Sequence, residues 1–439
     1  MGDDASLARS QPAAERRLLR AVEDLREELF DFAARLVRVP TVNPPGEAYA
    51  ECAELMTGEL SRCGFETRRI VAEGRPEHTA RHPRVNLLAS RAGSGTSPAL
   101  HFNGHVDVVP AGAGWSVDPF AGALRDGRLW GRGSADMKAG LACAVYACEA
   151  IRRAGVRLAG PLEVSATVDE ETGGQAGVRY LAEQGHLDPL RVGWVVIPEP
   201  FSPQRICVGH RGVYWFRLVT RGRTAHGSMP FLGHSAIGDM TRVLELVRDR
   251  LGPLAAKVVT ELPVVPEGAR RGSLNLNSLW GGQVPSGEEP AALLQSPCVA
   301  DRCELVVDRR FVPEEELEEV RAQVTGVLGE LADEQPPITV EIVDLLSVEP
   351  TRTPVGSPLV AALETSIQRV LGRPAEQVAS PGTYDQKHFD RIAGIPHCVA
   401  YGPGELEQAH QPDESCSLAA MVEATAVMAL TAVELLGVT

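Results

Sequence analysis

The sequence contains no Cys-x-x-Cys pair, although it has nine cysteines. This absence excludes the paired-cysteine knuckles of a zinc ribbon and favours reduced, mostly buried thiols. We therefore expect a cytoplasmic protein. The sequence also lacks any uninterrupted apolar run near the roughly 18 residues that a membrane-spanning helix needs, and it shows no signal peptide. No association with a membrane is expected.

Basic residues are few relative to acidic ones, with 43 Lys and Arg against 58 Asp and Glu and a net charge of −15. A chain this acidic repels phosphate backbones, so a nucleic-acid partner is not expected. There is no internal repeat and no low-complexity tract. What is present is the composition of a globular protein, 44% hydrophobic and 23% charged. The length of 439 residues predicts two or three domains, or one large domain with an insertion.

The order of the expected elements follows two patterns. Up to about residue 207, helical stretches alternate with short, continuously apolar strands, which predicts a mostly parallel sheet with helices on both faces. Residues 208–350 show the order strand, helix, strand, strand, helix, strand, which is a complete two-layer unit. We therefore predict an α/β catalytic domain formed by residues 1–207 and 351–439, interrupted by a smaller βαββαβ domain of residues 208–350.

Imidazole and acidic side chains recur near the ends of the expected strands and in the turns around them. Because ligands gather at the carboxyl ends of strands in open α/β sheets, we expect these side chains to converge on one site. Two histidines with several carboxylates suit zinc or a similar first-row ion, and one carboxylate could bridge two ions. Two ions would polarise a carbonyl group and lower the pKa of a water molecule. The set comprises His105, Asp107, Asp136, Asp169, Glu170, Glu171, Glu199 and His410.

Each of these residues also has a plainer interpretation when taken alone. Asp136 could cap the helix that begins near Met137, and His105 could be a histidine satisfied at a strand end. Glu170 and Glu171 could be exposed turn residues. Neighbouring side chains of extended chain point in different directions, so one glutamate could bind a metal while the other takes a proton. The hypothesis of a metal site depends on the joint occurrence of these residues in order.

From about Leu29 to Leu435 the sequence resembles the M20 family of metallopeptidases and deacylases, which includes acetylornithine deacetylase, succinyl-diaminopimelate desuccinylase, aminoacylase and glutamate carboxypeptidase. The matching segments are Thr41–Gly46, Gly104–Pro110, Gly131–Lys138, Asp169–Gly174 and Gly402–Gly404. The resemblance implies two Zn²⁺ ions, with Co²⁺ or Mn²⁺ as substitutes. It implies one ion held by His105, Asp136 and Glu199, and a second completed by Glu171 and His410, with Asp136 as the bridge.

The resemblance also implies roles for residues around the metal ions. Glu170 corresponds to the general base, and Asp107 to the residue that orients His105. Residues 208–350 correspond to the family's lid, which also mediates dimerisation, so a homodimer is expected. Within the lid, His226 corresponds to a histidine that reaches the partner's active site and donates a hydrogen bond to the developing oxyanion.

Four further residues match positions that contact substrate in the family: Asn275, Arg310, Gly382 and Thr383. Arg310 would pair with a substrate carboxylate, a task that suits a bidentate guanidinium. Alternatively, Arg310 could be a surface charge on a strand and Asn275 a sheet-face residue. Segments 252–272 and 283–300 depart from the family's pattern, so the lid's edge contacts and the fit of the substrate stay open.

The predicted function is that of a zinc-dependent amidohydrolase that cleaves the amide bond of a small molecule, an N-acyl amino acid or a similar carboxylate-bearing compound. Glu170 is its expected base. A dipeptidase or carboxypeptidase of the same family is the alternative. A metal-binding protein without activity is a third interpretation, against which the presence of every expected ligand and of the base argues. The sequence does not predict the acyl group, the amine, the native metal or the pathway.

Overall fold

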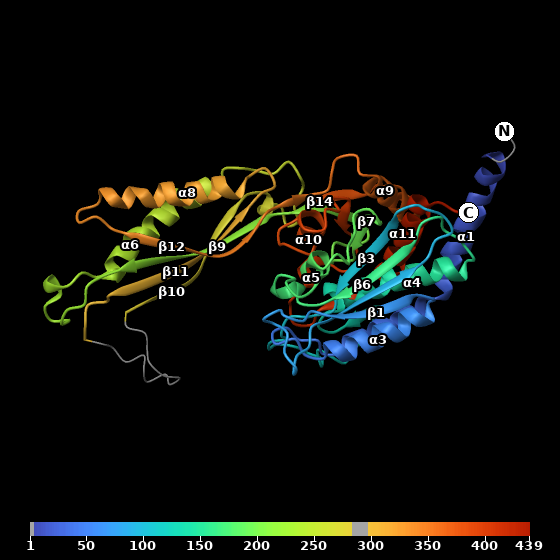
Figure 1. The fold of residues 1–439 in the computed structure, drawn as a ribbon, viewed down its shortest axis with the longest axis horizontal. Coiled ribbons are helices and arrows are strands. Elements are labelled where there is room, and N and C mark those ends of the chain that lie inside the picture. The colour runs from blue at the N-terminus through green and yellow to red at the C-terminus, as the bar shows by residue number, and fades with distance from the viewer. Residues whose placement is uncertain (1–3, 283–296) are drawn as a thin grey trace. The chain divides into compact units, whose positions relative to one another are not determined.

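The computed structural model describes residues 4–282 and 297–439, so most of the atypical segment 283–300 lies outside the described residues. The chain forms two compact units (Figure 1). The first unit comprises Met1–Gly209, Arg352–Val378 and Tyr384–Thr439, and the second comprises His210–Thr351 and Ala379–Thr383. That each unit is a domain in its own right stays a prediction.

The first unit is built on a nine-stranded sheet in the order β1-β2-β6-β3-β7-β15-β8-β13, with β14 paired to β8. The central strands β6, β3, β7 and β15 run parallel, whereas β1 and β2 are antiparallel to their neighbours. Every residue of β3 and β6 is buried, as expected for strands covered on both faces. The strands are β1 (Glu66–Val71), β2 (Val85–Arg91), β3 (Ala99–His105), β6 (Leu162–Thr167), β7 (Val192–Ile197), β8 (Arg205–His210), β13 (Thr351–Arg352), β14 (Glu376–Ser380) and β15 (Cys398–Ala400).

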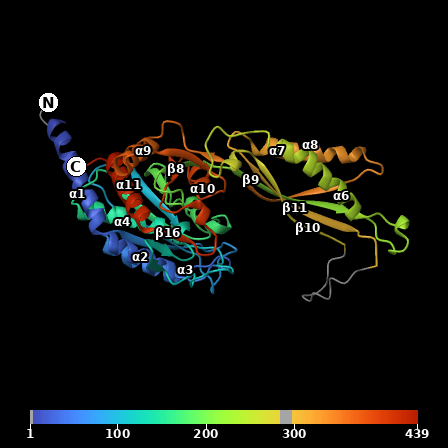
Figure 2. The same cartoon turned by 180° about the vertical axis from the view of Figure 1, so that it is seen from behind.

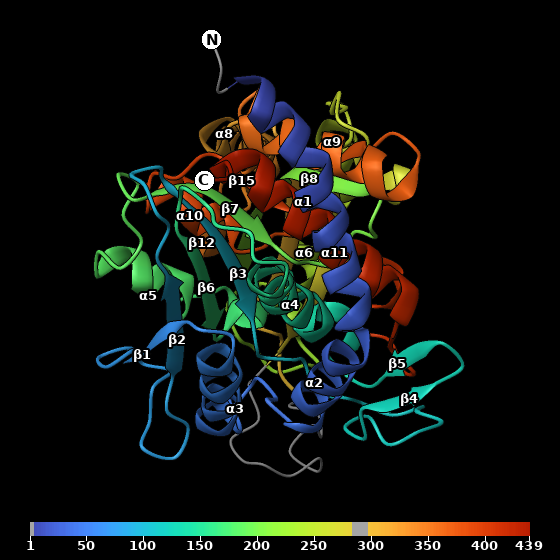
Figure 3. The same ribbon diagram turned by 90° about the vertical axis from the view of Figure 1, so that its right-hand side faces the viewer.

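Helices cover both faces of this sheet (Figures 2 and 3). On one face, α4 packs so closely on β3 that a Cβ atom at Gly104 would lie 2.9 Å from the Leu141 side chain. On the other face, the ring of His101 on β3 lies 5.8 Å from the ring of Phe389 on α10. The helices are α1 (Asp4–Asp24), α2 (Arg26–Arg38), α3 (Tyr49–Arg62), α4 (Ala139–Arg153), α5 (Val178–Glu183), α9 (Pro358–Leu371), α10 (Gln386–Arg391) and α11 (Leu418–Leu436).

Helix α11 has the length and the apolar composition of a membrane-spanning helix. It packs against α4, α9 and α1, however, so it is placed as the core helix of a globular unit. One such helix is therefore weak evidence for a membrane span. A small separate sheet in the order β16-β5-β4 completes the first unit, with strands β4 (Ala123–Arg125), β5 (Arg128–Trp130) and β16 (Ser415–Ser417).

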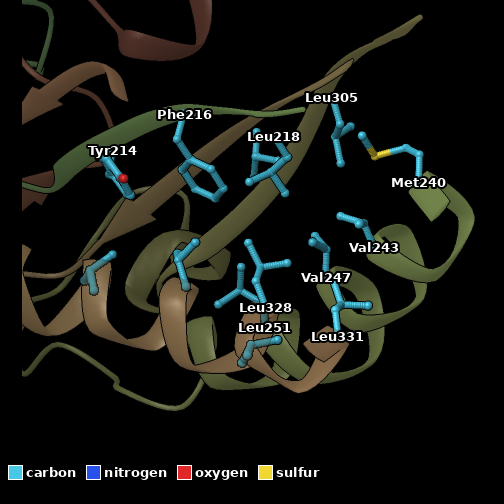
Figure 4. Packing of buried hydrophobic residues seen from close by; sticks show 14 of the residues in the cluster. Tyr214, Phe216, Leu218, Met240, Val243, Val247, Leu251, Leu305, Leu328 and Leu331 are labelled. Carbon is cyan, nitrogen blue, oxygen red and sulfur yellow. The ribbon is translucent and has the colours of Figure 1, made fainter. Parts of the chain in front are cut away.

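The second unit has the predicted order β9-α6-β10-β11-α8-β12, with a short additional helix, α7, after α6. Its antiparallel sheet has the order β10-β11-β9-β12. Phe216 and Leu218 of β9 pack against apolar residues of the helices, among them Val243 and Leu328 (Figure 4). The elements are β9 (Gly212–Arg221), α6 (Ala236–Leu246), α7 (Gly252–Ala255), β10 (Ser273–Gly281), β11 (Arg302–Phe311), α8 (Leu317–Gly329) and β12 (Val340–Val348).

The predicted fold class is confirmed: a largely parallel sheet with helices on both faces, together with a smaller βαββαβ unit. The sheet is more mixed than the sequence indicated, because β2 runs antiparallel to both of its neighbours, β1 and β6, and β8 runs antiparallel to β15. The atypical segment 252–272 is anchored within the second unit, where Leu262 and Val264 are buried and Val259 forms a bridge with Arg271.

Candidate metal centre

Three neighbouring parallel strands of the first unit deliver most of the predicted ligands. His105 is the last residue of β3, Glu170 and Glu171 follow β6, and Glu199 follows β7. Because β6, β3 and β7 are adjacent and parallel, their carboxyl ends meet at one edge of the sheet. Asp136 reaches the same place from the turn Ser134–Lys138, and His410 from the loop before β16.

The side chains of these loops converge around Asp136. Nε2 of His105 lies 3.2 Å from Oδ1 of Asp136 and 3.8 Å from Oε1 of Glu199. Nε2 of His410 lies 3.4 Å from Oδ2 of Asp136 and 3.1 Å from Oε1 of Glu171. Ligand atoms of His105, Asp136 and Glu171 all lie within 4.8 Å of one another. Asp136 thus presents one oxygen to each imidazole, which is the arrangement that a bridging carboxylate needs.

The carboxylates of Asp136, Glu171 and Glu199 lie close together and mostly buried, with side chains 8–12% exposed. Burial, followed by the charge of Asp136, raises the pKa of Glu199 well above its usual value and that of Glu171 to about 7. Burial by itself would raise the pKa of Asp136 as well, but hydrogen bonds with His105 and His410 lower it below the usual value. Buried carboxylates without compensating cations are costly, so the cluster suits a bound cation.

The two imidazoles respond to the same negative charge. Burial acts against protonation of His105, yet hydrogen bonds with Asp107 and Asp136 raise its pKa well above the usual value. Hydrogen bonds with Asp136 and Glu171 raise the pKa of His410 to about 10. Divalent ions take the place of such protons when they bind neutral imidazole. A donor set of imidazole nitrogens and carboxylate oxygens fits zinc or a related first-row ion.

The ring of His105 is oriented by Asp107, through its main chain more closely than through its carboxylate. Nδ1 of His105 lies 3.0 Å from the backbone oxygen of Asp107 and 3.5 Å from Oδ1 of the same residue. When Nδ1 carries the proton and donates it to the backbone oxygen, Nε2 has no proton. Nε2 is then the nitrogen that faces Asp136.

The carboxylate of Asp107 instead holds the turn that carries both glutamates. Its Oδ1 accepts the backbone N–H of Glu170 at 3.2 Å, and its Oδ2 accepts that of Glu171 at 3.1 Å. Asn43, in the segment Thr41–Gly46, donates from Nδ2 to the same Oδ2 at 3.1 Å. The predicted general base, Glu170, and the predicted ligand Glu171 are therefore both held at their backbone by one buried side chain.

Asp169, immediately before the two glutamates, has a left-handed backbone with φ of 62°. This conformation is uncommon for a residue other than glycine and persists only where the surroundings enforce it. Its carboxylate accepts hydrogen bonds from Nε of Arg84 and from the hydroxyl of Tyr49, both at 2.8 Å. The sequence motif indicated Asp169, but its two partners lie on distant segments without a motif of their own.

Lys387 is a further residue of the centre that sequence reasoning missed. Its Nζ lies 3.3 Å from Oε1 of Glu170, and the two residues are 217 positions apart in the chain. Nearby, Asp385 accepts a hydrogen bond from Nδ2 of Asn103 at 3.2 Å. No spacing pattern connects positions so far apart, so only the packing of α10 on the sheet shows them.

The remaining predicted residues belong to the second unit. Nδ1 of the exposed His226 accepts the backbone N–H of Ser228 at 3.1 Å, which leaves the proton of the neutral ring on Nε2. Nε of Arg310 donates to both carboxylate oxygens of Asp308, at 2.8 and 3.1 Å. Part of the guanidinium is therefore already engaged.

Asn275 donates to Oδ1 of Asn277 at 2.6 Å. The backbone N–H of Gly382, which precedes Thr383, donates to the hydroxyl of Ser380 at 3.2 Å. The functional roles assigned to all twelve site residues stay predictions.

Comparison with known proteins gives the same family as the sequence motifs. A family model described as peptidase family M20/M25/M40 matches residues 101–434. An N-formyl-4-amino-5-aminomethyl-2-methylpyrimidine deformylase of Bacillus subtilis (strain 168) is 30% identical over 447 residues, with 94% of this chain and 95% of that protein covered. A succinyl-diaminopimelate desuccinylase of Thioalkalivibrio sulfidiphilus (strain HL-EbGR7) is 29% identical over 364 residues, with 82% and 86% covered.

A solved structure shows the same fold. It is described as a dinuclear metal-binding peptidase from the M20 family of Bacillus subtilis, and it matches with a TM-score of 0.66 at 16% sequence identity. The match covers 95% of this chain and 100% of that one. At this level of identity the match establishes the fold and leaves the substrate open.

Proposed function

The chain belongs to peptidase family M20/M25/M40 and is a hydrolase of amide or peptide bonds, and we propose that it is a dinuclear amidohydrolase that removes the acyl group from a small amide. An N-acyl amino acid or a similar carboxylate-bearing compound is the proposed substrate. The observation that carries this proposal is the position of Asp136 between the two imidazoles, with Glu170 held beside Glu171 by Asp107.

The residues present fit a pair of divalent ions, and zinc is the ion that we propose. His105, Asp136 and Glu199 would hold one ion, and Asp136, Glu171 and His410 the other. When bound, such a pair supplies Lewis acidity at the substrate carbonyl and water of lowered pKa.

The side chains of the site then have separate tasks. Glu170 is the base that takes a proton from the attacking water and passes it to the nitrogen of the leaving amine. Asp107 fixes the backbone of Glu170 and so limits the positions that its carboxylate explores. Nε2–H of His226 is a donor for the oxyanion that develops on the substrate carbonyl.

We also propose that the protein is a homodimer formed through its second unit and that it acts in the cytoplasm. Strand β10 lies at an edge of its sheet and exposes Leu276, Leu279 and Trp280, which are apolar side chains unusual on an unpaired edge. All nine cysteines are free thiols, which supports a reducing compartment. Light scattering of the wild type and of Trp280→Glu tests the dimer: the variant should dissociate more readily, and a monomeric wild type would contradict the proposal.

A substrate panel tests the acyl specificity. Purified protein with zinc is supplied with N-formyl, N-acetyl and N-succinyl amino acids and, separately, with dipeptides that have free amino termini. The names of the two relatives, a deformylase and a desuccinylase, favour hydrolysis of the acyl compounds. The family's description as peptidases supports the alternative, a dipeptidase or carboxypeptidase, which dipeptide hydrolysis with inert acyl compounds would establish instead.

A further inference from the structure

A buried ion pair lies beside the candidate metal centre and contains none of its ligands. Nη1 of Arg132 lies 2.6 Å from Oε2 of Glu414, and their side chains are only 2% and 0% exposed. A buried ion pair is weak evidence for stability, because desolvation of both charges offsets their attraction. The contacts of Arg132 and Glu414 with the surrounding backbone point to a role in positioning the neighbouring segments.

Glu414 binds the turn that carries Asp136. Its Oε1 accepts the backbone N–H of Ala135 at 2.8 Å and that of Asp136 at 3.1 Å. The backbone oxygen of Glu414 also accepts the N–H of Gly131 at 2.9 Å. Glu414, which lies four residues after His410, thereby holds the Asp136 turn at two points and the segment just before it at a third.

Arg132 makes the reciprocal attachment. Its Nη2 donates to the backbone oxygen of His410 at 3.3 Å, and its Nη1 to that of Gln411 at 3.3 Å. Nη2 also donates to the backbone oxygen of Ala111 at 3.2 Å. The guanidinium lies over the Trp115 ring, 5.2 Å from its centroid. The backbone of His410 is left-handed, with φ of 63°, a conformation that such contacts have to enforce.

We infer that Arg132 and Glu414 are positioning residues that set the separation between Asp136 and His410, and that they thereby determine the affinity of the ion held by Asp136, Glu171 and His410. This inference rests on the proposed dinuclear centre. Asp136 belongs to both ligand sets, but His410, whose backbone Arg132 binds, belongs to that set alone. The other set takes His105 from the end of β3 and Glu199 from the residues after β7. Loss of the pair therefore affects the two ions unequally.

The test is a titration of metal-free protein with Co²⁺, followed by visible absorption, in the wild type, Glu414→Gln and Arg132→Lys. Glu414→Gln keeps an acceptor for the Asp136 turn but removes the charge, and Arg132→Lys keeps the charge but removes the planar fork. The Co²⁺ equivalent that His410→Ala eliminates should lose about 10- to 100-fold in affinity, the usual effect of removing support from metal ligands. The equivalent that His410→Ala leaves bound should lose less, because Asp136 is its one proposed ligand on the segments that the pair holds.

Glu149→Gln is the matched control. Glu149 is a buried carboxylate of α4 that pairs with Arg152 and Arg153 and contacts neither ligand loop. The Glu149→Gln substitution should lower the thermal stability of the metal-free protein without changing its affinity for either Co²⁺ ion. The inference is overturned if the wild type binds two ions and Glu414→Gln and Arg132→Lys bind both as tightly, or if Glu149→Gln weakens the second ion equally. A wild type that binds no Co²⁺ would overturn the proposed centre itself.

Discussion

Asp136 and His410 meet at 3.4 Å between Oδ2 and Nε2, although they come from segments of the chain that are far apart. The other oxygen of Asp136 faces His105 at 3.2 Å. The carboxylate of Asp136 therefore lies between the two histidines, and the proposed chemistry depends on this position. The expectations below follow from the contacts around it.

Replacement of the proposed base should separate catalysis from metal binding. Glu170→Gln removes the group that transfers the proton, so kcat should fall by roughly 10²- to 10⁴-fold. The metal content should stay that of the wild type, because Glu170 is not among the proposed ligands. Steady-state kinetics and metal analysis of the same preparations check this, with the exposed Glu73→Gln as control. A variant with near-normal kcat would remove Glu170 from the mechanism.

Asp107→Asn should disturb both the base and the metal site. An amide of the same shape offers one acceptor oxygen in place of two, so one of the backbone N–H groups of Glu170 and Glu171 loses its partner. We expect kcat and the affinity for the second ion to fall about 10- to 100-fold. Kinetics at saturating zinc, compared with kinetics at limiting zinc, separate the two effects. Unchanged behaviour under both conditions would contradict the role of Asp107.

Asp385 should make the metal-free protein less stable as the pH rises. Burial, followed by the charge of Glu170, raises the pKa of Asp385 to about 7 from an ordinary value of 3.8. Between these values the folded form binds more protons than the unfolded form, so the free energy of unfolding falls as the pH increases.

Urea unfolding in the presence of a chelator, at about pH 4 and about pH 7.5, measures this effect. The free energy of unfolding should fall less in Asp385→Asn than in the wild type, because an amide has no proton to lose. Parallel pH profiles for the two proteins would show that Asp385 does not titrate in this range.

His226 should act on catalysis without acting on metal binding. Loss of an oxyanion donor costs about 10²- to 10³-fold in kcat, so His226→Ala should show a decrease of that order with full metal content. If the histidine serves the partner subunit, mixed dimers of His226→Ala and Glu170→Gln should regain activity, because one of the two sites then has both groups. Mixed dimers that stay inactive would contradict action in trans.

The sequence predicts that the proposed ligands converge, because they stand near the carboxyl ends of strands. His105, Glu171 and Glu199 lie at or just after the ends of three strands that are adjacent and parallel in the structure. The alternating pattern predicts a largely parallel sheet, but it does not predict the order of these strands. The reversed direction of β2 could not be predicted, because the apolar pattern of a strand does not specify in which direction it runs beside its neighbours.

The contacts around the proposed centre could not be read from the sequence. Arg84 binds Asp169, Lys387 approaches Glu170, and Arg132 binds Glu414, in each case across more than 80 positions of the chain. Such pairs depend on how the elements pack, and the local period of the sequence contains no information about them. His226 and Arg310 were indicated only by resemblance to the family.

The metal content of the protein tests the central claim most directly. Protein saturated with zinc and then desalted should retain about two ions per chain in the wild type, about one in His410→Ala, and close to none in Asp136→Ala, because Asp136 belongs to both proposed ligand sets. This graded loss is the result that a bridging Asp136 predicts. A wild type that retains no zinc, or an Asp136→Ala variant that retains as much zinc as the wild type, would contradict the dinuclear centre.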